Sequence, residues 1–180
     1  TYTFKDMPKQ YGNTTYSYAI KEVDVSSDYV TSGSVWSGND RDGYSKTLTN
    51  TLLVGYLKLH KDSSLPNVTN GNRCYDLKGA EYTVYQTRSG NTLSNPVGKL
   101  TTNSNGDTNT LRLLRRTYYV KETKAATGYE LDSTIYTVTI SGNHTESKPY
   151  LLNVKDVPGN DPTGIEIDKI YNGPDTDTVK

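Results

Sequence analysis

Three alternating stretches of apolar residues each end on a charged side chain, and this pattern constrains the fold more than any other feature. The stretches read Leu57-x-Leu59-x-Lys61, Tyr118-x-Val120-x-Glu122 and Leu152-x-Val154-x-Asp156. Residues two apart on a β-strand point to the same face of the sheet. We therefore expect Lys61, Glu122 and Asp156 to share one apolar interior. Isolated buried charges are costly, so these groups must be paired, neutralised or joined covalently.

The composition favours small β domains and gives no electrostatic reason for a charged partner. Of 180 residues, 32% are hydrophobic, with 16 Tyr but one Phe and one Trp. Tyr, Thr and Val suit half-buried strands, where an aromatic ring packs and its hydroxyl reaches water. The 20 Lys and Arg balance the 20 Asp and Glu, so we expect no nucleic-acid partner.

Seven short strands separated by turns predict an all-β sandwich in the middle of the chain. Turn residues between them include Ser89-Gly90-Asn91, Asn105-Gly106-Asp107 and Ser141-Gly142-Asn143. The expected strands are 56–61, 80–86, 97–102, 109–114, 117–123, 134–140 and 150–156.

Neither a disulfide, a metal centre nor a membrane span is expected. Cys74 is the only cysteine, and His60 and His144 have no Cys or His at ligand spacing. No apolar run reaches membrane-spanning length, and the first residues do not form a signal peptide. We expect no cofactor, because no phosphate loop, nucleophile elbow or zinc motif is present.

The chain also repeats itself at a spacing typical of tandem domains. Tyr16–Glu22 parallels Thr117–Glu122, and Gly164–Lys169 parallels Tyr56–Lys61. The two glutamates are 122 − 22 = 100 positions apart, and Lys61 and Lys169 are 169 − 61 = 108 apart. We expect 1–54 to be the C-terminal part of one repeat, 55–157 a complete repeat, and 158–180 a linker with the first strand of a third.

The middle repeat resembles a known family, the collagen-adhesin (Cna) B-type repeats and the related SpaA-like pilin domains of Gram-positive surface proteins. The most specific match is Tyr119-Val120-Lys121-Glu122-Thr123-Lys124-Ala125-Ala126-Thr127-Gly128-Tyr129-Glu130. Further matches are Leu77-Lys78-Gly79-Ala80-Glu81-Tyr82 and Val154-Lys155-Asp156-Val157-Pro158. The first segment looks like the second half of such a repeat.

The resemblance implies tandem Greek-key, immunoglobulin-like (prealbumin-like) sandwiches that serve as beads of a surface stalk. It places the protein outside the cell, on a bacterial surface, anchored to the cell wall through a region beyond this chain. The expected partners are neighbouring repeats of the same polypeptide. The rival interpretation is a module that binds a host matrix protein or glycan, for which the long insertion 62–76 is the only candidate. An enzyme with turnover is not expected.

The resemblance also implies an intramolecular isopeptide bond between a lysine and an Asn or Asp, assisted by a glutamate. Carried over, Lys61 is the nucleophile, Asp156 the acceptor and Glu122 the assisting acid. Lys58 stays open as an alternative lysine, because the acidic residue usual two positions after the family's lysine is replaced by Ser63. Asn153 is a competing acceptor that alternates onto the other face of its strand.

Partial sets of the same residues occur in the flanking segments. In the first segment, Glu22 and Asn50 are the matching positions, and their lysine would precede Thr1. In the third segment Lys169 is present, and its Glu and Asn or Asp would lie beyond Lys180.

Overall fold

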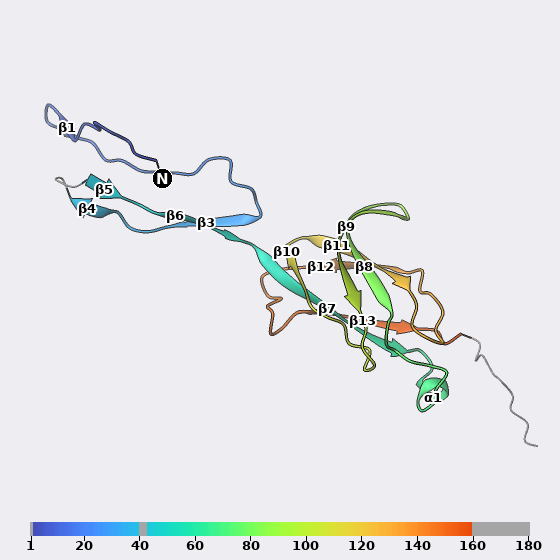
Figure 1. Cartoon of the computed structure of the whole chain (residues 1–180). Helices are drawn as coiled ribbons and strands as arrows, with labels where there is room; N and C mark the ends of the chain where they lie inside the picture. Colours follow the sequence, from blue (N-terminus) through green and yellow to red (C-terminus); the bar gives the residue numbers. More distant parts are fainter. Residues whose placement is uncertain (1, 40–42, 160–180) are drawn as a thin grey trace, which may run out of the picture. The chain divides into compact units, whose positions relative to one another are not determined.

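The computed structural model describes residues 2–39 and 43–159, and the chain divides into two units, Thr1–Leu53 and Val54–Lys180 (Figure 1). Within the described residues the fold is all-β apart from one short helix, α1 (Pro66–Thr69). Lys169 and the rest of the expected third segment from residue 160 onward lie outside the described residues. The boundaries of the three expected repeats stay a prediction.

The first unit consists of three two-stranded sheets. Among its residues 2–39 and 43–53, none is buried, so this unit has no apolar core of its own. Its longest pairing joins β3 and β6 in antiparallel register, with Thr31 opposite Asn50. The strands are β1 (Gln10–Tyr11), β2 (Thr14–Thr15), β3 (Tyr29–Gly33), β4 (Ser37–Asn39), β5 (Gly43–Ser45) and β6 (Leu48–Leu52).

The second unit contains a three-stranded and a four-stranded sheet. The first has the order β10-β7-β13, in which β7 pairs antiparallel with β10 and parallel with β13. The second is antiparallel throughout, in the order β12-β11-β8-β9. The strands are β7 (Val54–Ser63), β8 (Glu81–Ser89), β9 (Thr92–Thr101), β10 (Leu111–Leu114), β11 (Thr117–Lys124), β12 (Ile135–Thr139) and β13 (Tyr150–Asp156).

One hydrophobic core lies between these two sheets, which makes the second unit a β sandwich. Both sheets supply alternate residues to it, as the period of two predicts. The three-stranded sheet contributes Leu57, Leu59, Leu113 and Val154, and the four-stranded sheet contributes Tyr82, Val84, Leu100, Tyr118, Val120 and Val138. The expected all-β sandwich fold is confirmed.

The long segment between β7 and β8 carries α1 and closes one end of the sandwich (Figure 1). Tyr75 in this segment donates a hydrogen bond from its hydroxyl to the Gly159 carbonyl, at 3.1 Å. The ring of Tyr75 also meets the ring of Tyr129 edge to face, with centroids 5.6 Å apart. This segment therefore covers Tyr129 and holds the chain where it leaves the last strand.

Candidate functional site

Strand β7 carries Lys61 into the interior because the residue shares its parity with two core leucines. Leu57, Leu59 and Lys61 are all 0% exposed. The backbone around Lys61 is held by the turn before β10, since the Lys61 amide donates to the Gly106 carbonyl at 2.9 Å. Gly106 has φ +79°, and a Cβ there would collide with the Lys61 carbonyl. The glycine thus permits a close approach that fixes the lysine backbone.

Strands β11 and β13 bring the two carboxyl groups to the same place. Glu122 follows Tyr118 and Val120 on the buried face of β11 and lies opposite Tyr82 in the sheet register. Asp156 is the last residue of β13, which runs parallel to β7 with Val154 opposite Lys61. Because both strands point their even-numbered residues inward, the two carboxyls enter the same interior.

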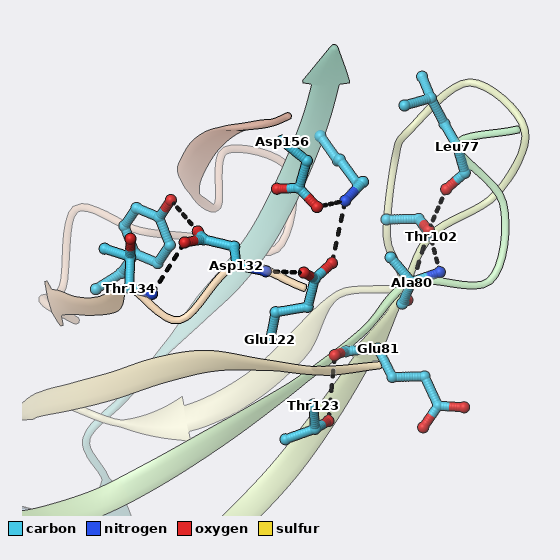
Figure 2. A network of polar contacts seen from close by, with 11 residues as sticks. Leu77, Ala80, Glu81, Thr102, Glu122, Thr123, Asp132, Thr134 and Asp156 are labelled. Carbon is cyan, nitrogen blue, oxygen red and sulfur yellow. Dashed lines mark hydrogen bonds and ion pairs between the residues drawn. The ribbon is translucent and has the colours of Figure 1, made fainter. Parts of the chain in front are cut away.

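The structure brings the three side chains into direct contact. The Lys61 Nζ lies 3.0 Å from Glu122 Oε1 and forms a closer ion pair with Asp156 Oδ2. The side chains of all three residues are 0% exposed. Figure 2 shows the two carboxyl groups of Glu122 and Asp156 facing the same amine. An amine and a potential acyl carbon therefore adjoin in a site without solvent.

Burial and missing donors make this environment unfavourable for charge, although two aromatic rings face the amine. The rings of Tyr129 and Tyr82 lie with centroids 5.2 and 5.9 Å from the Lys61 Nζ. Burial lowers the pKa of Lys61, against the opposing effects of Glu122 and then Asp132. Within the described residues, neither Asp156 oxygen accepts a hydrogen bond of ordinary geometry. The buried Asp156 carboxylate is therefore compensated by Lys61 alone, a costly arrangement for a static ion pair.

Glu122 has a second partner that sequence reasoning did not find. The Asp132 amide donates to Glu122 Oε2 at 2.7 Å, so each oxygen of this carboxyl meets a different donor (Figure 2). Asp132 lies in the loop before β12, where no alternating pattern marks it as inward-facing. Tyr82, in contrast, shares its parity with Ala80 and Val84 in an expected strand, which could have identified it as a neighbour of the site.

The alternative reacting residues lie away from this cluster. Lys58 is on the opposite face of β7, where its amine pairs with Asp107 at 3.2 Å. Asn153 is exposed and lies opposite His60 in the register of β13 and β7. Neither side chain enters the interior that holds Lys61, Glu122 and Asp156.

The partial set in the first unit is also brought together. Asn50 donates from Nδ2 to Glu22 Oε1 at 2.9 Å, and Thr31 donates from its hydroxyl to Asn50 Oδ1 at 2.6 Å. Glu22 and Asn50 are both exposed. Lys169 is outside the described residues, so its surroundings are not described.

Comparison with known proteins identifies a family that the second unit resembles. Residues 68–153 match the family model of the SpaA prealbumin-like fold domain. This part of the chain is similar to the SpaA domain family. The matched segment of the SpaA domain runs from α1 into β13 and includes Glu122. The expected resemblance to SpaA-like domains is confirmed.

Solved structures similar to the chain include two major pilins and one further bacterial protein. The full-length major pilin SpaD from Corynebacterium diphtheriae is 21% identical, with 65% of this chain and 36% of that chain covered and a TM-score of 0.47. BcpA, the major pilin subunit of Bacillus cereus, is 18% identical, with 78% and 41% covered and a TM-score of 0.42. The Bacillus anthracis TIE protein is 17% identical, with 72% and 25% covered and a TM-score of 0.45.

The chain spans between a quarter and about two fifths of these structures, as the shares of 25%, 36% and 41% show. Among curated proteins, no sequence matches it significantly. In the part of the chain that the structure describes, no helix has the length and apolar character to cross a membrane. Over the same residues, no group of three or more His, Cys, Asp or Glu side chains is arranged to hold a metal ion.

Proposed function

We propose that the second unit is a structural segment of a stalk on a Gram-positive cell surface, in an adhesin or pilin, and that a self-formed isopeptide bond joins Lys61 to Asp156. The observation that carries this proposal is the contact of one fully buried amine with two fully buried carboxyls. The match of residues 68–153 to the SpaA prealbumin-like fold domain supports the stalk role. Its partners would be neighbouring repeats of the same polypeptide, and its anchor would lie in a region beyond this chain.

The proposed reaction is a condensation in which Glu122 carries protons. The ammonium of Lys61 gives a proton to Glu122, and the free amine attacks Cγ of Asp156. The new C–N bond forms as one C–O bond breaks, and Glu122 passes protons from the nitrogen to the departing oxygen. The net change converts one ammonium and one carboxylate into an amide and one water, and Glu122 ends as it began. Fixed geometry makes this poor reaction effectively intramolecular.

This chemistry happens once in each molecule, so the protein is its own product and turns over no substrate. Formation of the amide removes two buried charges, each of which would otherwise need the other as its ion-pair partner. It also joins the first strand of the sandwich, β7, to the last, β13. A force applied along the stalk would then load the covalent bond before it could separate the strands of the sheet.

Intact mass spectrometry tests the proposal. We expect the purified chain to be one water lighter than its sequence. Lys61→Arg should restore the full mass, because a guanidinium remains protonated and does not attack a carboxyl. Lys58→Arg is the matched control on the same strand and should keep the lighter mass. A wild-type chain at the full sequence mass would overturn the proposed bond.

We extend the same proposal to the flanking partial sets. The contact between Asn50 and Glu22 supports an equivalent acceptor in the first unit, from which ammonia would leave. Lys169 would be the nucleophile of a following repeat. Neither set is complete within residues 1–180, so the mass of this chain should reflect the middle bond alone.

A second candidate function, ligand binding, is favoured by one observation. The 62–76 insertion lines a polar hollow together with Tyr129 and Lys155. The insertion's own contributions include Asn70, Arg73, Tyr75 and Asp76. Binding to host matrix proteins and to a glycan array, compared with an Arg73→Ala chain, tests this candidate. Binding that the substitution abolishes would support it, and binding to none of these probes would reject it.

A further inference from the structure

Glu122 accepts hydrogen bonds from two donors, and these donors differ in whether they can also accept a proton. Its Oε1 accepts from the Lys61 amine at 3.0 Å, and its Oε2 accepts from the Asp132 amide at 2.7 Å. A backbone N–H donates but does not accept. A proton that Glu122 receives therefore resides on Oε1, the oxygen that faces the reacting amine.

The side chain of Asp132 accepts two hydrogen bonds, and these fix the position of the Asp132 backbone amide. Asp132 Oδ1 accepts from the Thr134 amide at 2.9 Å, and Oδ2 accepts from the Tyr136 hydroxyl at 2.6 Å. Figure 2 shows Asp132 between Glu122 and Thr134. The first of these bonds closes a tight turn, and such turns are a common role of aspartate.

Tyr136 connects this turn to the strand that carries Glu122. It belongs to β12, which pairs with β11 in a register that places Tyr136 opposite Val120 and Ile135 opposite Lys121. The hydrogen bond from the Tyr136 hydroxyl therefore fixes Asp132 relative to the sheet. The Asp132 amide in turn positions Oε2 of Glu122. Every member of this chain of contacts is at least partly shielded from solvent except Thr134.

We propose that Asp132 and Tyr136 are positioning residues for the condensation: they hold the Asp132 amide on Oε2 of Glu122, so that Glu122 takes and returns protons through Oε1. This inference rests on the proposed isopeptide bond and adds residues outside the reacting three. It accounts for the use of a loop residue at a site otherwise built from strands. Neither residue touches the atoms that react.

The test compares the rates of bond formation in newly made chains. Each variant is produced by cell-free synthesis, quenched in acid at intervals, and measured for the fraction that is one water lighter. Rates are taken per folded chain, with folding followed by near-ultraviolet circular dichroism on the same samples. We expect Tyr136→Phe and Asp132→Ala to slow the reaction roughly tenfold or more, since small misplacements of a catalytic group are costly.

Conservative and matched variants separate positioning from simple loss of structure. Asp132→Asn keeps an acceptor for the Thr134 amide and should react faster than Asp132→Ala. Tyr119→Phe removes a hydroxyl from the opposite face of β11, and Thr145→Ala removes a turn bond outside these contacts, which the Thr145 hydroxyl accepts from the Lys148 amide at 3.2 Å. Both controls should react at the wild-type rate.

Folded Tyr136→Phe and Asp132→Ala chains that link at the wild-type rate would overturn this inference alone. A wild-type chain that never links would instead overturn the proposed function on which it rests.

Discussion

At the scale of single residues, the central fact is a lysine whose side chain is buried away from solvent. Lys61 is 0% exposed, yet its amine contacts two carboxyls that are equally buried. Parity along the strands predicted that these three side chains share an interior, and the same parity separates Lys61 from Lys58. Asp132 could not be predicted, because a loop amide has no periodicity and every residue type except proline supplies it.

Exchanging the acceptor tests the chemistry at Asp156. In Asp156→Asn, the same attack by Lys61 should expel ammonia in place of water. The amide that forms is the same in both chains, so their linked masses should coincide although their sequence masses differ. Intact mass spectrometry checks this. An Asp156→Asn chain that stays at its own sequence mass would contradict the assignment of residue 156 as acceptor.

The lowered pKa of Lys61 predicts how an unlinked chain responds to pH. Burial lowers this pKa below the usual 10.5, so between the two values the unfolded chain binds a proton that the folded chain does not. The free energy of unfolding of Glu122→Gln, which we expect to stay unlinked, should therefore rise with pH in that window. The slope can reach about 1.4 kcal/mol per pH unit.

Urea unfolding from neutral pH to about pH 9.5 measures this slope. The series stops below the usual pKa of tyrosine, because burial raises the pKa of Tyr82 and Tyr136 and their effect on stability has the opposite sign above pH 10. The linked wild-type chain serves as control and should lack the rise, since an amide does not titrate. Equal slopes in both chains would contradict the prediction.

At the scale of elements, alternation and turn residues predicted the sandwich strands closely, because a half-buried strand must alternate. The expected strand 150–156 is observed without change as β13. The expected strand 97–102 begins earlier, at Thr92, since a two-residue turn at Gly90 and Asn91 continues the ladder with Ser89 opposite Thr92. Helix α1 was not expected, and its one turn is too short to show a helical period.

The close approach at Gly106 gives a prediction for this turn. Gly106→Ala should destabilise the domain by about 1–3 kcal/mol more than Gly79→Ala, because only the first Cβ would collide with the Lys61 backbone. Both glycines have positive φ, +79° and +89°, so the conformational cost of about 1–2 kcal/mol is common to the two. Urea unfolding of the two variants measures the difference. Equal losses would show that the contact is unimportant.

At the scale of the whole molecule, the repeats predicted which residues correspond but not how each unit pairs its strands. Glu22 and Asn50 are hydrogen-bonded at 2.9 Å, and their correspondence to Glu122 and Asp156 stays a prediction. The strand of Asn50, β6, pairs antiparallel with β3, and β13 pairs parallel with β7, whose counterpart in the first repeat would precede Thr1. Strand partners are chosen by contacts far apart in sequence, which a local pattern does not contain.

The proposed bond should dominate the stability of the sandwich as a whole. It closes a loop of 156 − 61 = 95 residues, which corresponds to about 4–5 kcal/mol by the relation used for disulfides. Lys61→Arg should therefore unfold about 20 °C below wild type for a domain of this size. Lys58→Arg should stay near wild type, and a reducing agent should change neither chain. A melting difference of a few degrees between Lys61→Arg and Lys58→Arg would contradict this expectation.

Peptide mapping tests the central claim most directly, because it identifies the bond itself. Trypsin does not cleave after an acylated lysine, so digestion of the linked chain should give one branched peptide that joins residues 59–73 to residues 156–169. Fragmentation of this peptide should place the branch between Lys61 and Asp156. Recovery of 62–73 and 156–169 as separate linear peptides would contradict the account.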